Sequence, residues 1–148
     1  MKAKLLVAVA FCLAAVGCST GDVYHNETII QGVTLFNDVI EVQGNEWRES
    51  GQKGNPGYYL YREFKFPEIT ASVVKNGAVL VYLIDGENRY NILPYVHPLE
   101  NDINNLVMQN FRYEVEPGIL TLVVEAQDFW NYIPMNSNYK FKVCIIKP

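Results

Sequence analysis

From about residue 28 onward, the chain consists of short apolar runs that are separated by glycine, asparagine, aspartate and proline. The runs are rich in tyrosine, valine, isoleucine and phenylalanine, which suit a pleated, half-buried strand. Hairpins and loops join them, with almost no helix for crossover connections, so the strands are expected to pair antiparallel. The sequence predicts an all-β fold: an antiparallel two-sheet β-sandwich, Ig-like or jelly-roll-like, with at most one short helix. The candidate strands are residues 28–30, 33–36, 39–42, 58–66, 78–84, 90–93, 106–115, 119–126 and 139–146.

Two links between these strands have the chemistry of hairpin turns. One is the run from Asp85 to Asn88, and the other contains Pro117 and Gly118, the order that a type II turn prefers. Residues 67–77 form the candidate helix, because a proline suits the first helical position and an asparagine-glycine pair suits the stop.

The spacing of apolar residues predicts how some strands face the core. In residues 139–146, alternation puts Phe141, Val143 and Ile145 on one face and Cys144 on the other, where we expect a packed small side chain rather than a reactive thiol. Residues 78–84 do not alternate, which is typical of a central strand covered on both faces. The candidate cover is the helix at 67–76.

The first residues have the form of a secretory signal rather than of folded structure. Lys2 and Lys4 precede an apolar run of twelve residues, whereas a membrane-spanning helix needs about 20. Cys18 directly follows the small residues Ala-Val-Gly, an arrangement that resembles the lipobox of bacterial lipoproteins, in which the thiol takes diacylglycerol. The alternative is ordinary cleavage near Gly17. We therefore expect a signal peptide at 1–17 and lipidation at Cys18.

Beyond the signal, the chain is divided into a lipidated cysteine with a tether at 18–27 and a single domain at 28–148. The tether can span at most about 30 Å, so the domain should lie close to its membrane. We expect a lipid-anchored protein of the bacterial cell envelope, at the outer membrane, with the periplasmic and surface faces both open as orientations.

The acidic charge of the chain after the signal argues against nucleic acid and anionic lipid as partners. Residues 18–148 carry ten basic and sixteen acidic side chains, and ten minus sixteen gives a formal charge of −6. An acidic chain without a basic stripe does not suit nucleic acid, and it is not attracted to anionic lipid. The expected membrane contact is therefore the lipid on Cys18 alone.

The residues for common catalytic and metal sites are sparse. His25 and His97 are far apart, and a structural zinc site needs four closely spaced ligands. We read His97 as a loop residue and expect no cofactor and no metal. Calcium is an alternative for the oxygen-rich runs 85–88 and 100–104, although neither has the spacing of an EF-hand.

Aromatic residues form the remaining pattern, because several fall in expected loops or strand ends. Such rings serve as stacking platforms for sugars or as interface anchors. In the alternative, they fill the core at the ends of the sandwich. The candidate ligand-binding residues are Trp47, Tyr95, Trp130 and Tyr132, with Phe129 beside them.

These features favour a noncatalytic interaction module that binds a protein partner or a glycan through its loop aromatics. One alternative is a glycosidase-type enzyme that uses a carboxylate pair such as Asp85 with Glu87 or Asp128, since two carboxylates are the minimum for that chemistry. The other is a purely structural envelope protein.

Four runs, in this order, resemble a group of small uncharacterised lipoproteins and secreted proteins of Bacteroidetes: residues 68–70, 76–82, 93–95 and 139–146. The resemblance covers roughly residues 58–148. It implies an envelope location and a β fold, and it implies no catalytic residue. Surface-exported lipoproteins of that phylum carry several acidic residues after the lipidated cysteine, whereas this chain has only Asp22 close behind Cys18.

Overall fold

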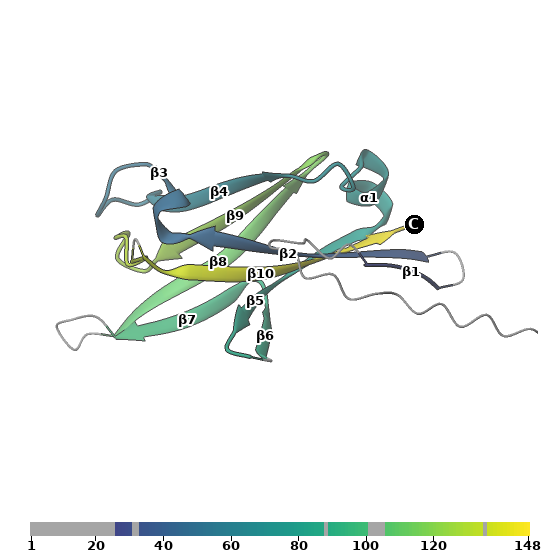
Figure 1. The fold of residues 1–148 in the computed structure, drawn as a ribbon. Helices are drawn as coiled ribbons and strands as arrows, with labels where there is room; N and C mark the ends of the chain where they lie inside the picture. Colours follow the sequence, from purple (N-terminus) through teal and green to yellow (C-terminus); the bar gives the residue numbers. More distant parts are fainter. Residues whose placement is uncertain (1–25, 31–32, 88, 101–105, 135) are drawn as a thin grey trace, which may run out of the picture.

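The computed structural model describes residues 26–148 except 31–32, 88, 101–105 and 135. The expected signal peptide, Cys18 and the tether up to residue 25 lie outside the described residues. Two five-stranded sheets face each other across one core (Figure 1). All of the strand pairs are antiparallel, so the predicted two-sheet sandwich is confirmed.

Sheet A contains, in spatial order, β1 (Asn26–Ile30), β2 (Val33–Gln43), β10 (Asn138–Lys147), β5 (Ala78–Asp85) and β6 (Arg89–Ile92). Sheet B contains β3 (Arg48–Ser50), β4 (Tyr59–Lys65), β9 (Ile119–Ala126), β8 (Leu106–Glu116) and β7 (Tyr95–Glu100). The short helices are η1 (Gly44–Glu46), between β2 and β3, and α1 (Ala71–Asn76), between β4 and β5. Neither of these two described helices is long and apolar enough to cross a membrane.

The core lies between the sheets and comes from alternate residues of their strands. Phe141, Val143 and Ile145 of β10 are completely buried, as their alternation predicts, and Leu122 and Val124 of β9 face them from sheet B. Each such side chain contributes about 1.5–3 kcal/mol when it leaves water, so these central strands hold the sheets together. Cys144, on the opposite face of β10, is also buried, as expected.

Strand β2 is continuous, although residues 33–36 and 39–42 were expected to form separate strands. Asn37 and Asp38, which look like a break in sequence, pair with Cys144 and Val143 and continue the ladder. The tertiary pairing with β10 therefore overrides the low strand preference of two polar residues.

His97 lies in strand β7, so the expectation that it is a loop residue is wrong. His97 pairs with Gln109, and Pro98 pairs with Met108. Proline cannot donate to a ladder and is confined mainly to edge strands. β7 is at the edge of sheet B, which explains how a strand can contain Pro98.

The helix is shorter than expected and begins later. Thr70 is its N-cap, and the Thr70 hydroxyl oxygen accepts a hydrogen bond from the Val73 amide at 3.2 Å. Pro67 is therefore not the first helical residue. The helix contacts β5, β10 and β8, and it lies at one end of the sandwich instead of over the outer face of β5 (Figure 1).

Both predicted hairpin turns are present. The turn after Asp85 joins β5 to β6, and the Pro117-Gly118 turn joins β8 to β9. Gly118 has a φ of 82°, which the third position of a type II turn requires and which glycine adopts without strain.

Candidate binding surface

The loop between β9 and β10 begins with a sharp reversal at Phe129. The Phe129 amide donates to the Ala126 carbonyl at 3.0 Å, and Phe129 has a φ of 61°, which is uncommon for a residue other than glycine. One Asp128 carboxylate oxygen accepts from the Trp130 amide at 3.3 Å, and the other accepts from the Tyr132 hydroxyl. The short polar side chain of Asp128 thus braces the segment that carries both rings.

A second loop, between β3 and β4, supports this segment from the side. The Gly54 amide donates to the Phe129 carbonyl at 2.9 Å. Gly54 has a φ of 78°, and a Cβ added there would lie 3.6 Å from Nε1 of Trp130. The indole therefore rests against a backbone that has no side chain, and it remains 53% exposed.

The far end of the β9–β10 loop is tied to the start of η1. The Gly44 amide donates to the Ser137 carbonyl at 2.8 Å, and an added Cβ at Gly44 would come within 1.8 Å of the Pro134 carbonyl oxygen. Only glycine permits this approach. Ile133 is buried, so the loop is anchored at its base as well as at its reversal.

A shallow open depression of about 550 Å³, here called the Phe129 groove, begins beside this loop. It crosses the outer face of sheet B, where Val96, Asn110 and Glu125 face one another on three neighbouring strands. Val96 is 53% exposed. The groove is lined by Pro94, Val96, Met108, Asn110, Glu125, Ala126, Gln127 and Phe129.

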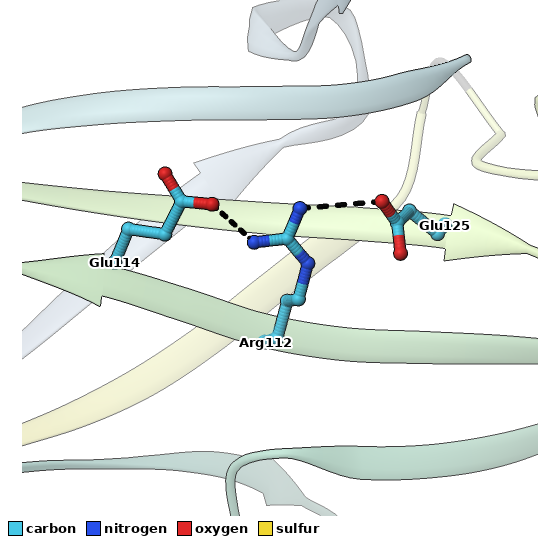
Figure 2. Close-up of polar contacts among 3 residues, drawn as sticks. All are labelled: Arg112, Glu114 and Glu125. Atoms are coloured by element: carbon cyan, nitrogen blue, oxygen red, sulfur yellow. Dashed lines mark hydrogen bonds and ion pairs between the residues drawn. The ribbon is translucent and has the colours of Figure 1, made fainter. Parts of the chain in front are cut away.

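One side chain of the groove, Glu125, is held by an ion-pair cluster. The Arg112 guanidinium lies between Glu114 and Glu125, with its Nη2 atom 3.2 Å from the Glu125 carboxylate (Figure 2). Partial burial lowers the pKa of Arg112, but the bonds to the two carboxylates outweigh that effect, so its pKa is raised overall. Arg112 stays charged and fixes the position of Glu125.

The four candidate aromatics do not form one cluster. Trp130 and Tyr132 share the β9–β10 loop. Tyr95 lies in β7 and packs against the core, with its ring 6.1 Å from the ring of His97. Trp47 is only 8% exposed and meets Tyr139 and Phe141 edge-on, with centroids 6.4 Å apart in each pair.

Trp47 therefore follows the alternative in which such rings fill the core, and we remove it from the binding residues. Val96, Met108 and Glu125 line the groove but were not among the residues predicted from the sequence. Val96 is on the unpredicted strand β7, so no sequence signal placed it beside β8 and β9.

The carboxylates proposed for an enzyme have different surroundings in the fold. Asp85 is at the end of β5, where it pairs with Arg89 at 3.4 Å, and Asp128 is bonded within its own loop. A smaller depression, of about 250 Å³, contains Asp85 with His97 and Tyr139, and neither Glu87 nor Asp128 lines it. The described lining of this depression does not contain the carboxylate pair that a glycosidase needs.

No cluster of three or more His, Cys, Asp or Glu side chains in the described part of the chain could hold a metal ion. Of the two runs that we considered for calcium, residue 88 and residues 101–104 lie outside that part.

Comparisons of this chain with family models, with curated proteins and with solved structures returned no match.

Proposed function

We propose that this protein is a noncatalytic, lipid-anchored interaction module of the bacterial cell envelope that binds a glycan or a protein partner through its loop aromatics. The observation that carries the proposal is the Trp130 indole, which is 53% exposed on a loop braced by Asp128 and Gly54. Tyr132 belongs to the same loop, and the Phe129 groove extends the surface.

An exposed tryptophan on a fixed loop suits binding for two reasons. Its ring offers a large apolar area with one polar N–H, the combination that is enriched at the centre of interfaces. Because the loop is already ordered by hydrogen bonds, a partner would not have to order it, and less binding energy is lost to entropy.

The groove adds polar groups to this apolar ring. The Glu125 carboxylate and the amides of Asn110 and Gln127 alternate with the apolar side chains of Val96 and Met108. Carboxylates and amides accept and donate hydrogen bonds, as sugar hydroxyls require, so this lining favours a glycan over a purely apolar partner.

The proposed anchor is diacylglycerol on Cys18, followed by a short tether that keeps the domain near its membrane. We place the protein at the outer membrane, where a loop with an exposed aromatic ring would meet envelope polymers or other envelope proteins.

Binding to the native envelope tests the proposal. The purified protein is immobilised and exposed to solubilised envelope, either untreated, treated with periodate to destroy sugar rings, or treated with protease. We expect retained material with the wild-type protein and at least about a tenfold loss with Trp130→Ala. Loss after periodate identifies a glycan, and loss after protease identifies a protein.

The matched control is Tyr90→Ala, which removes another exposed aromatic ring from β6 of sheet A. Equal retention by the wild type, by Trp130→Ala and by Tyr90→Ala would contradict the proposal and leave the purely structural alternative.

A further inference from the structure

Strand β4 has a pairing edge that is only partly used. β3 pairs with residues 59–61 of β4 and extends no further along it. The Phe66 amide donates to the Gly118 carbonyl at 2.9 Å, on the β9 side, and Phe64 pairs with Leu120. In a strand, backbone groups alternate between the two sides, so those of Glu63 and Lys65 point toward the edge. None of the described strands lies opposite them.

A pocket of about 220 Å³ lies beside this open edge, and most of the charged residues that line it are cationic. Arg48, Arg62 and Lys65 contribute three positive charges to it, against one carboxylate, that of Glu63. Within the described residues, neither Arg48 nor Lys65 forms an ion pair. This concentration of positive charge contrasts with the net acidic character of the chain.

Arg62 is only partly satisfied by its neighbours in this pocket. Its Nη2 atom lies 3.4 Å from the Glu46 carboxylate, and its guanidinium carbon lies 5.5 Å from the centre of the Phe64 ring. Its Nε atom is buried and has no hydrogen-bond partner among the described residues. A buried donor without a partner costs free energy, and a carboxylate is the group that an arginine side chain binds best.

Charged residues at a strand edge also have a simpler role, which is to prevent edges from pairing with one another. Lys65 fits that role. Arg62 fits it less well, because it pairs with the buried Leu122, its Nε is buried, and its side chain is only 29% exposed. A second copy of this chain would bring its own cations to the same edge and would be repelled.

We propose that the open edge of β4 receives an extended acidic segment of a partner protein, which adds as a strand beside Glu63 and Lys65 and places a carboxylate against Arg62. Main-chain hydrogen bonds to the edge supply affinity, and the cationic pocket selects the side chain, as in other cases of strand addition. The site is separate from Trp130 and goes beyond the proposed function.

A defined peptide tests this site. The purified protein is titrated into a fluorescein-labelled hexapeptide in which glutamate alternates with valine, and binding is followed by fluorescence anisotropy. We expect saturable binding that weakens as salt rises, because salt screens exposed charges. A peptide with lysine in place of each glutamate should bind at least about tenfold more weakly. A glutamate peptide that is N-methylated at every amide should lose about as much, since it cannot pair with the edge.

Variants of the protein separate charge from strand pairing. Arg62→Met removes the guanidinium, and Lys65→Pro removes the N–H that faces the edge while Phe64 and Phe66 keep their bonds to β9. Each should weaken binding of the glutamate peptide about tenfold. Lys75→Ala, which removes an exposed lysine of α1, should leave binding unchanged. If Lys65→Pro does not fold, the N-methylated peptide answers the same question with the wild-type protein.

The proposal is overturned if the glutamate peptide does not bind, or if it binds no better than the lysine peptide. Equal binding of the N-methylated peptide would show charge attraction without strand addition and would also overturn it. If Lys65→Ala self-associates while the glutamate peptide does not bind, these charges only protect the edge. Trp130→Ala should leave peptide binding intact, so a failure here and a failure of the proposed function are distinguishable.

Discussion

The indole of Trp130 packs on the backbone of Gly54, where an added Cβ would be 3.6 Å from Nε1 of the ring. The contact supports one side of the ring without enclosing it, and 53% of the residue stays exposed. The ring is thus positioned without being part of the core.

The first prediction is that Trp130→Ala lowers the free energy of unfolding by only about 1 kcal/mol or less, because about half of the residue is exposed and it lies outside the core. Trp47→Ala should instead cost about 3–5 kcal/mol, because it empties a core site beside Tyr139 and Phe141. Chemical denaturation of the two variants measures both. A large loss for Trp130→Ala would move that residue to the core and remove it from the binding surface.

Buried Tyr58 and partly buried Tyr113 should differ in how much stability is lost with the hydroxyl. The Tyr113 hydroxyl donates to the Val79 carbonyl at 2.7 Å, so Tyr113→Phe should cost about 1 kcal/mol. The Tyr58 hydroxyl is buried beside the Glu49 carboxylate without a well-formed hydrogen bond, so Tyr58→Phe should cost less stability than Tyr113→Phe at neutral pH. Urea unfolding at neutral pH compares them. Equal losses would show that Tyr58 has a partner in solution.

Tyr58 should also make stability depend on alkaline pH. Burial, and after it the Glu49 carboxylate nearby, raises the pKa of Tyr58 to about 12 from its ordinary value of 10.0. As pH rises above 10, the unfolded chain loses this proton before the folded protein does, so stability falls between the two values. Relative to Tyr58→Phe, the wild type should lose about 1 kcal/mol by about pH 11. If wild type and Tyr58→Phe differ in free energy of unfolding by the same amount at neutral pH and at about pH 11, the raised pKa of Tyr58 is contradicted.

The Cys144 thiol should react slowly in the folded protein. It is 8% exposed, and burial raises its pKa, an effect that Lys142 opposes only weakly. Both factors reduce the amount of accessible thiolate, the reactive form. Labelling by iodoacetamide should therefore be at least about tenfold slower in buffer than in urea. Equal rates would place the thiol at the surface.

The lipid anchor is tested at Cys18. Cys18→Ser removes the thiol that we propose carries the lipid, so the variant should stay in the aqueous phase of a detergent partition while the wild type enters the detergent phase. The fold should not change, and a near-ultraviolet circular dichroism spectrum provides the control. Equal partitioning of both proteins would contradict lipidation at Cys18.

Alternation predicted much of the fold because it reflects burial on one face of a strand. Phe141, Val143 and Ile145 show this pattern, and all three are in the core. Strand β3 was not predicted, because its three residues, Arg48–Ser50, have no apolar pattern and form a strand through pairing with β4. Strand β7 was not predicted because of Pro98, which an edge position allows.

The candidate site was less predictable, since burial of an aromatic ring depends on distant residues. Trp47 and Trp130 both lie outside the alternating runs of the sequence. Trp47 is buried because Tyr139 and Phe141, far along the chain, pack against it. Trp130 is exposed because its neighbour in space is Gly54, which has no side chain to cover the ring.

The position of β10 determines when sheet A can be completed. β10 lies between β2 and β5 and is the partner of both, yet it is made after all the other described strands. A nascent chain that ends before residue 138 therefore contains two strands with matching edges and nothing to join them. Sheet A is complete only once residues 138–147 are in place between β2 and β5, so we expect the domain to fold as a unit rather than strand by strand.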